Sequence, residues 1–439
     1  MRLKSLIAGT VLAGTLAGAA LPAFADELYV PLFSYRTGPY AGSGIPIANG
    51  MHDYLTMLNE RDGGINGVKL RIAECETGYD TQKGVECYEQ VKGEGALVIS
   101  PYSTGITLQV IPKASVDQIP VLSMAYGLSA AAEGNTFPWV FNPPNTYWDG
   151  ASAIVTDIAR REGGGDDALK GKKIGYIFLD AGYGREPIPL LEKMASDMGF
   201  ELLQYPVPGK EMQNQSSQWL NIRRDRPDYM IMWGWGAMSP TAVKEATKIR
   251  YPMDKFYGIW WSGGNDDAAA GGEAAKGYRT LNFHGVGSDY PVMDDIKKHV
   301  VDAGKSEVDP AKFADNLYNR GVYNSMLIAE GIRRAQEITG KTVIDAKDMR
   351  VGLENLDITE ERLKEMGMEG FALPMKLSCE DHSGHHKVYV VEWDGKDWQK
   401  SGDWFSPDVD LVKPLLEQAA KDYAESNAPW PERTEACVN

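Results

Sequence analysis

The sequence is poor in the residues and motifs on which most enzymes depend. It holds six histidines and four cysteines in 439 residues, and three of the histidines fall in one short loop. It contains no GxSxG nucleophile elbow, no GxxxxGK[ST] phosphate loop and no HExxH zinc motif. Gly182 and Gly184 form a lone GxG, which is weak evidence for a nucleotide site without a third glycine and an acidic partner. We therefore expect neither an enzyme nor a bound cofactor.

Long hydrophobic runs are absent beyond the first 25 residues. There, Arg2 and Lys4 precede an apolar run from Leu6 to Leu21, and a small-residue motif ends at Ala25. This order is typical of a secretory signal, whereas a membrane anchor would need a longer run with fewer Gly and Thr. We predict a signal peptide cleaved near Ala25 and a location in the periplasm. Cleavage leaves 414 residues (439 minus 25), enough for two domains with separate cores.

Positive charge is also scarce. The chain has 45 Lys and Arg against 61 Asp and Glu, a formal net charge of −16, without long blocks of one sign. This balance argues against nucleic acid and against anionic membranes as partners. It does not decide the charge of a small ligand, because a few local groups set that.

The stretch that begins at Leu28 has the alternation of a βαβ unit. Leu28 to Phe33 and Val68 to Ala73 are short apolar runs that predict parallel strands. Between them, Ile47 to Asn59 places apolar residues at helical spacing, and a second amphipathic helix begins near Thr81. Ligands of such sheets usually lie at the carboxyl ends of the strands. The loop Ser34 to Gly44 lies at such an end.

The pattern continues and then restarts at a helix from Ala151 to Arg161, which predicts two doubly wound parallel-sheet lobes. Crossing strands near Asn142, Thr280 and Leu373 would join the lobes around a cleft. The expected divisions are 26–143 plus 283–378 for lobe 1, 144–282 plus 379–405 for lobe 2, and 406–439 for a C-terminal helix and tail. The other expected strands are Gly95 to Ser100, Pro120 to Met124, Trp139 to Pro144, Lys173 to Leu179, Glu201 to Pro206, Tyr229 to Trp233, Lys255 to Trp261, Tyr278 to Phe283 and Lys387 to Trp393.

Several motifs carry a family resemblance. TGPYAGSG, NERDGGINGVKLRI and ECETGYD closely resemble the opening of the branched-chain amino-acid-binding proteins, the periplasmic receptors of ABC importers. The likeness continues more weakly through ISPYSTGIT, IPVLSMAYG, IGYIFLDAGYG and LYNRGVYNSMLIAEGI, and covers roughly Leu28 to Trp398. It implies a type I periplasmic binding fold, a small-molecule ligand, and importer permease and ATPase subunits as partners. We expect a monomer, and the alternative from a different class is a ligand sensor of a signalling system.

The even number of cysteines in an exported chain suggests two disulfides. Cys75 ends a strand and Cys87 lies on the next helix, so we expect these two to pair and Cys379 to pair with Cys437. A zinc site is the rival, because the loop CEDHSGHH (Cys379 to His386) offers imidazoles and carboxylates. The other interpretation of this loop is a solvated turn, and we expect no metal.

The candidate ligand site combines hydroxyls with aromatic rings. Ser103 and Thr104 precede a helix, where they either cap it or, with its free N–H groups, bind a carboxylate. The resemblance favours ligand contact. Two tryptophan pairs follow lobe 2 strands beside glycines, which favours a cleft wall over a core position. The predicted ligand-binding residues are Tyr40, Tyr102, Ser103, Thr104, Ala125, Tyr126, Tyr183, Trp233, Trp235, Trp260, Trp261 and Ser262.

The resemblance also bears on the kind of ligand. In relatives that bind aliphatic amino acids, an acidic residue that pairs with the ammonium group is expected where this chain has Trp261 and Ser262. Asp266 or Asp267 could substitute if the loop folds back. Tyr126 would narrow the space in lobe 1, and the aromatic side chains could stack on a ring. We therefore favour an aromatic or other bulky carboxylate over leucine, isoleucine or valine, with a branched-chain or other amino acid as the alternative.

Overall fold

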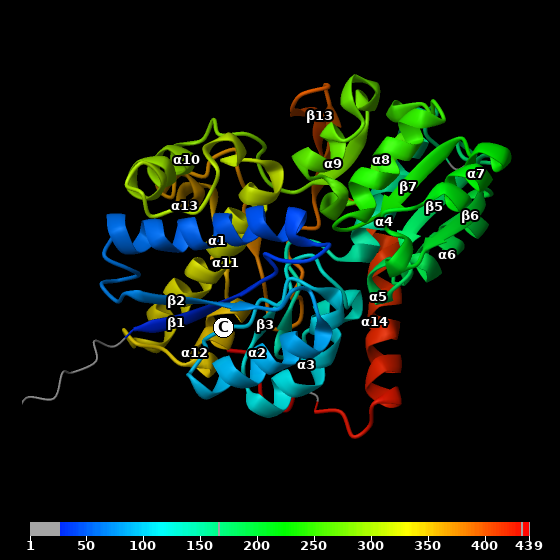
Figure 1. Ribbon diagram of the computed structural model, residues 1–439. Coiled ribbons are helices and arrows are strands. Elements are labelled where there is room, and N and C mark those ends of the chain that lie inside the picture. The colour runs from blue at the N-terminus through cyan, green and yellow to red at the C-terminus, as the bar shows by residue number, and fades with distance from the viewer. Residues whose placement is uncertain (1–26, 166, 432, 439) are drawn as a thin grey trace, which may run out of the picture.

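The structure is a computed structural model that describes residues 27–165, 167–431 and 433–438. The predicted signal peptide lies outside these residues. None of the described helices combines the length and the apolar character needed to cross a membrane. Two α/β lobes lie side by side, with helix α14 (Val409–Ser426) running below their junction (Figure 1).

The sheet of lobe 1 is built around β1, which pairs in parallel with β2 from Leu28 to Ser34. Residues 97–99 are not a regular strand, although a strand is predicted there. They nevertheless join the sheet, because Leu97 N–H donates to Tyr29 O at 3.0 Å and Ile99 N–H to Pro120 O at 2.9 Å. The strands of lobe 1 are β1 (Leu28–Ser34), β2 (Leu70–Glu76), β3 (Val121–Leu122), β4 (Val140–Phe141), β10 (Asp357–Ile358) and β11 (Met375–Lys376).

Helices cover both faces of this sheet, with α1 and α11 above it and α2 and α3 below it in Figure 1. α1 and α11 pack at very short range: a Cβ on Gly50 would lie 2.0 Å from Tyr318 O, and a Cβ on Gly321 would lie 2.1 Å from Ile47 O. The helices of lobe 1 are α1 (Ala41–Arg61), α2 (Thr81–Gly93), α3 (Thr104–Asp117), α10 (Pro291–Ile296), α11 (Asn316–Thr339), α12 (Ala346–Glu354) and α13 (Glu360–Glu365).

Lobe 2 contains a seven-stranded sheet of order β13-β12-β9-β8-β7-β5-β6. The five strands from β9 to β6 are parallel, and β12 and β13 add an antiparallel hairpin at one edge. Helices α7 and α8 lie on one face, and α4 and α6 on the other (Figure 1). The strands are β5 (Lys173–Leu179), β6 (Glu201–Val207), β7 (Tyr229–Trp233), β8 (Phe256–Gly258), β9 (Arg279–Asn282), β12 (Val388–Trp393) and β13 (Trp398–Phe405). The helices are α4 (Tyr147–Arg161), α5 (Gly182–Arg185), α6 (Ile188–Met198), α7 (Ser216–Asp225), α8 (Met238–Lys248) and α9 (Asn265–Ala269).

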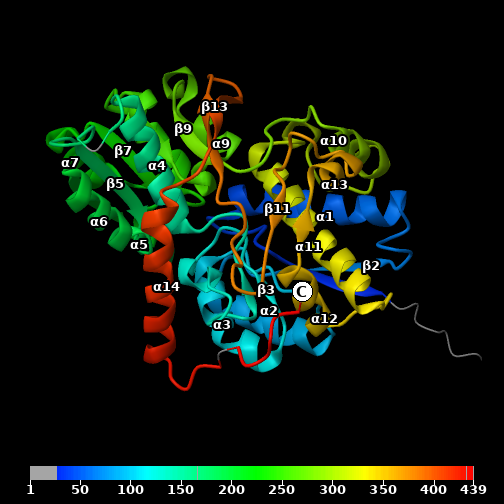
Figure 2. The ribbon, with the colours of Figure 1, turned by 180° about the vertical axis from the view of Figure 1, so that it is seen from behind.

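The chain passes between the two lobes three times, after β4, after β9 and after β11. The first and third crossings are bonded to each other: Asn142 N–H donates to His382 O at 2.9 Å, and His386 N–H donates to Pro144 O at 3.1 Å. Figure 2 shows the third crossing rising between the lobes toward β13. This arrangement confirms the predicted fold class, while the residue boundaries of the lobes stay a prediction.

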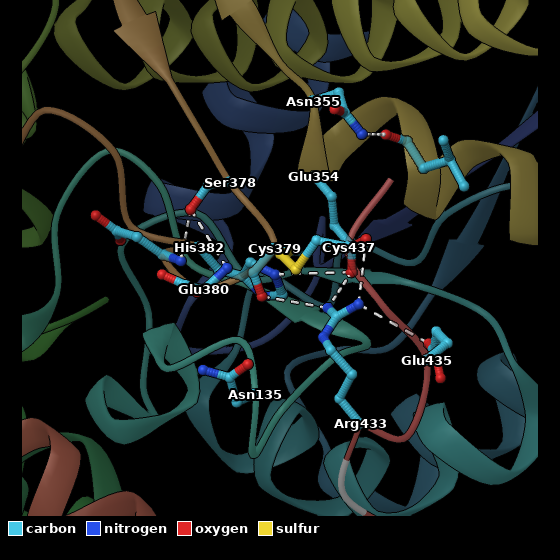
Figure 3. The surroundings of a disulfide bond; sticks show 12 residues. Asn135, Glu354, Asn355, Ser378, Cys379, Glu380, His382, Arg433, Glu435 and Cys437 are labelled. Atoms are coloured by element: carbon cyan, nitrogen blue, oxygen red, sulfur yellow. Dashed lines mark hydrogen bonds and ion pairs between the residues drawn. A yellow bond between two sulfur atoms is a disulfide. The ribbon is translucent and has the colours of Figure 1, made fainter. Parts of the chain in front are cut away.

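The C-terminal tail is fixed to lobe 1. Cys379 and Cys437 form a disulfide, as do Cys75 and Cys87, so both predicted pairs are present. Beside the first of these, Arg433 donates to Cys379 O at 3.2 Å and pairs with Glu354 (Figure 3). These contacts hold the end of the chain against the base of the third crossing.

Other element predictions are wrong in part. The predicted loop Ser34 to Gly44 is shorter, because α1 begins at Ala41 and Gly44 packs directly against the ring of Tyr35. The predicted strand Lys255 to Trp261 ends at Gly258, where Ile259 O accepts from Ser262 N–H at 2.7 Å and turns the chain into a 3₁₀ turn. Strand β13 is not predicted at all.

Candidate functional site

A cluster of aromatic side chains fills the space between the lobes. Its members come from loops at the carboxyl ends of the strands in both sheets, where the sequence places them. Tyr126, Trp233, Trp235, Trp260 and Trp261 are each at most 1% exposed. The cleft is therefore closed in this structure, and the predicted cleft wall lies in its interior.

Trp260 and Trp261 tie lobe 2 to lobe 1. Both indole N–H groups donate to one carbonyl of lobe 1, Ala125 O, at 3.2 and 3.0 Å. The ring of Tyr126 stacks on Trp261 with centroids 4.0 Å apart and an interplanar angle of 30°. Tyr102 lies edge-on to Tyr126 at 6.1 Å. The predicted residues Tyr102, Ala125, Tyr126, Trp260 and Trp261 thus meet at one place.

The rim of the cleft is closed by the loops after β1 and β7. Ala237 N–H donates to Pro39 O at 2.9 Å across the lobes. Tyr40 stacks on Tyr79 at 4.1 Å, so the predicted residue Tyr40 belongs to this rim. Trp235 lies edge-on to Tyr35 at 6.3 Å and connects the rim to the interior.

Ser103 and Thr104 occupy the predicted helix start, but their hydroxyls have partners within the protein. Ser103 Oγ caps α3 by accepting from Ile106 N–H at 3.4 Å, and Thr104 Oγ1 lies 3.0 Å from the hydroxyl of Tyr147. Burial raises the pKa of Tyr147 well above its usual value, so that hydroxyl stays protonated. The capping interpretation is therefore observed for Ser103. A ligand acid group would have to share these hydroxyls.

The lobe 2 wall has both occupied and unpartnered donors. Ser262 Oγ donates to Gly234 O at 2.8 Å and accepts from Gly234 N–H at 3.1 Å, so it links two loops of lobe 2. Tyr183 OH also donates to Gly234 O, at 3.0 Å. In contrast, the indole N–H groups of Trp233 and Trp235 have no hydrogen-bond partner in the described part of the chain. Buried donors usually have a hydrogen-bond partner, so these two groups are open to a ligand acceptor or to water.

The hydroxyl of Tyr102 is likewise buried, and among the described residues it has no partner. The backbone at this residue is left-handed, with φ of 50°, and Tyr79 and Ala125 have φ of 61° and 55°. Such conformations are unfavourable for non-glycine residues and cluster at ligand sites. Three loops of lobe 1 thus hold strained backbone at the cleft.

Glu186 is the acidic side chain at this site that the sequence did not reveal. It follows α5 in lobe 2, and its Oε1 accepts from Ser129 N–H of lobe 1 at 2.6 Å. A Cβ on Gly127 would lie 2.1 Å from its Oε2, so glycine makes room for the carboxyl group. Burial raises the pKa of Glu186 to about 7, although the Ser129 N–H opposes the shift.

The two aspartates that could replace the missing acidic residue are engaged elsewhere. Asp266 pairs with Lys312 at the surface. Asp267 is buried, and its Oδ2 accepts from Gly264 N–H at 3.1 Å at the start of α9. Burial raises the pKa of Asp267 to about 8. Neither side chain offers a free carboxylate to a ligand ammonium group.

The histidines of the loop Cys379 to His386 point to different partners. His382 is buried, with Nδ1 2.7 Å from Val140 O, and its ring stacks on Phe141. His386 Nδ1 lies 3.1 Å from Asp149 Oδ2, and although burial opposes it, Asp149 and Asp381 raise the pKa of His386 to about 10. In the described ranges no three His, Cys, Asp or Glu side chains converge as metal ligands. This loop is part of the third crossing, and its backbone is hydrogen-bonded to the first crossing.

Several residues of the cluster are absent from the sequence-based prediction. Tyr35 directly follows β1 and Tyr79 is the third residue after β2, positions that could have identified them. Tyr147 begins α4 after the first crossing and lies 5.7 Å from Trp233. Glu186 gave no such signal, because it follows the short helix α5.

Comparison with known proteins identifies the family of the chain and similar solved structures. Residues 27–400 match the family described as "Periplasmic binding protein". A solved structure described as an ABC transporter permease from the Pseudomonas fluorescens group is 39% identical, covers 94% of this chain and 100% of its own, and has a TM-score of 0.86. A branched-chain amino acid ABC transporter from Thermus thermophilus with bound valine is 20% identical over 89% of this chain and 99% of its own, with a TM-score of 0.74. No curated protein matches.

A third structure, an R. palustris solute-binding protein in complex with benzoate, is 18% identical over 87% of this chain and 98% of its own, with a TM-score of 0.68. All three descriptions name ABC transporters, and the R. palustris protein is described as the solute-binding protein of one. The family match and the 39% identity together show that this chain belongs to the periplasmic binding protein family, with the type I fold of the leucine-binding proteins.

Proposed function

We propose that this protein is a periplasmic receptor that captures a small carboxylate with a ring, such as a benzoate or phenylpropanoid derivative, and delivers it to the permease and ATPase subunits of an ABC importer. The observation that carries the proposal is the aromatic cluster between the lobes, in which donors on Trp233, Trp235 and Tyr102 have no hydrogen-bond partner among the described residues. Flat rings bind by stacking on such walls, and a few placed N–H and O–H groups fix the acid group.

Two of the structural neighbours support this choice at the level of the fold. R. palustris solute-binding proteins are described in complex with benzoate and with 4-hydroxybenzoate. At 18% and 16% identity they show that the fold holds aromatic acids, while the residues of this chain must supply the specificity.

An amino acid is the second candidate, and Glu186 is the observation that favours it. Its carboxyl group lies at the cleft, and a ligand ammonium group beside it would supply the missing counter-charge. The Thermus thermophilus neighbour is described with bound valine. Against this candidate, no aspartate at the expected position is free, because Asp266 and Asp267 have partners within the protein.

Thermal-shift screening of the mature protein separates the two candidates. The panel contains benzoate, 4-hydroxybenzoate and cinnamate beside leucine, isoleucine and valine, and titration calorimetry follows every hit. We expect stabilisation at micromolar concentrations by at least one aromatic acid. Micromolar stabilisation by valine or leucine with none by aromatic acids would overturn the ligand choice and leave the receptor role intact.

A further inference from the structure

Arg320 carries a buried positive charge that has no acidic partner in the described part of the chain. The side chain lies on α11 and is 0% exposed. Its Nε donates to His284 Nε2 at 2.9 Å, its Nη2 donates to Asn282 Oδ1 at 2.5 Å, and its Nη1 donates to Trp260 O. Across 27–165, 167–431 and 433–438, no Asp or Glu forms an ion pair with this guanidinium.

Two other arginines with largely buried side chains are paired. Arg350 donates to Glu354 Oε1 at 2.8 Å, and Arg433 pairs with the same carboxylate. A buried charge without a counter-charge is costly, so the environment of Arg320 is unusual. Burial lowers its pKa to about 9, which leaves it cationic at neutral pH. His284 is a neutral acceptor, because burial and then Arg320 hold its pKa well below the usual value.

The guanidinium lies directly behind the wall of the cleft. Its Cζ is 5.1 Å from the ring centroid of Trp261. The ring of Tyr126, a predicted ligand-binding residue, stacks on the same indole at 4.0 Å. The positive charge is therefore coupled to the aromatic cluster through Trp261.

We propose that Arg320 selects an anionic ligand in the closed cleft by acting across the indole of Trp261. The inference rests on the proposed function and names the charge of its ligand. A ligand carboxylate on the cleft side supplies the counter-charge that the fold lacks. At an effective dielectric of about 20, an anion within about 10 Å of the guanidinium is favoured about tenfold or more over a neutral molecule of the same shape.

The test compares benzoate with benzamide, which have the same ring and differ in charge. Calorimetry gives the ratio of the two affinities for wild type and for Arg320→Gln, which removes the charge and keeps hydrogen-bonding groups. We expect the ratio to fall about tenfold in Arg320→Gln and to be largely kept in Arg320→Lys. Arg362→Gln is the matched control, because Arg362 pairs with Glu330 at 2.8 Å. Glu330 lies on α11 ten residues after Arg320, which places this ion pair about 15 Å farther along the helix.

A second variant tests the proposal even if Arg320→Gln does not fold. Asn282→Asp leaves Arg320 in place and puts a carboxylate on the Nη2 contact. Asn282 Nδ2 also donates to His284 O at 2.9 Å and to Asn316 Oδ1 at 3.0 Å, so this variant loses stability, and only the affinity ratio is compared. The ratio should fall here too, because Arg320 then has an internal partner.

The outcomes are distinct. An affinity ratio that stays at the wild-type value in Arg320→Gln or in Asn282→Asp would overturn the role of Arg320. If valine stabilises the wild type and benzoate does not, the aromatic ligand is wrong, and valine against valinamide tests Arg320 by itself. Binding of none of the four compounds would overturn the anionic ligand and the role of Arg320 together.

Discussion

Ligand affinity should fall as pH rises, because Glu186 changes its environment when the lobes close. In an open form its carboxyl group would be hydrated, with a pKa near the usual 4.5, whereas in the closed form burial raises it to about 7. The closed form therefore holds a proton that the open form releases between these two values. Closure is most favourable below pH 4.5, and this contribution is lost as pH rises through 7.

The size of the effect follows from the two pKa values. A shift from 4.5 to about 7 corresponds to about 3 kcal/mol, and the partial exposure of Glu186 reduces this figure. We expect the affinity for a ligand that stays ionised to fall about 10- to 100-fold between pH 5 and pH 8. Ser129 N–H favours the charged form, but the desolvation of the carboxyl group is the larger cause.

Calorimetry in one buffer series from pH 5 to pH 8 measures the effect with the tightest ligand of the panel. Glu186→Gln keeps an oxygen for Ser129 N–H and should have a nearly flat profile. Glu192→Gln is the control, because Glu192 lies on α6 and accepts from Gln204 at 3.0 Å, away from the cleft. Asp267 titrates too, since burial raises its pKa to about 8, but it is intact in both variants. A Glu186→Gln profile as steep as that of the wild type would refute the reasoning.

Three further perturbations test the fold and the site. Cys437→Ser opens a disulfide that spans 58 residues, so the free energy of unfolding in denaturant should drop by roughly 4 kcal/mol. An unchanged midpoint of the unfolding curve would show that the disulfide to the tail does not stabilise the fold. Gly50→Ala should lower the free energy of unfolding by about 2 kcal/mol or more in the same assay, because the added Cβ would lie 2.0 Å from Tyr318 O. Gly42→Ala is the control and should be neutral, since a Cβ there meets nothing within 4 Å. Equal effects of the two substitutions would contradict the packing argument. Trp261→Ala removes a stacking ring and a bond between the lobes, so calorimetry should show affinity reduced about 30-fold, and wild-type affinity would exclude Trp261 from the site.

The strands that the sequence predicts best are buried on both faces. β5 (Lys173–Leu179) and β7 (Tyr229–Trp233) have the predicted bounds, because continuous apolar runs between turn residues mark the centre of a parallel sheet. β13 (Trp398–Phe405) lacks such a run: it is an edge strand in which only Trp398 is buried, and Gly402 lies inside it. Its pairing with β12 decides its structure, and that pairing has no local signal.

The sequence by itself determined the class of fold, the pairing of the cysteines and the aromatic character of the cleft. These properties follow from local patterns: apolar periodicity, the order of cysteines along the chain, and the fact that residues after parallel strands meet at one edge of the sheet. Only the tertiary structure decided that Trp260 and Trp261 share the carbonyl of Ala125, and that Glu186 and Arg320 lie at the cleft. Those contacts join residues 57 to 136 positions apart, and their energies come from burial and from the loss of water, which no local pattern records.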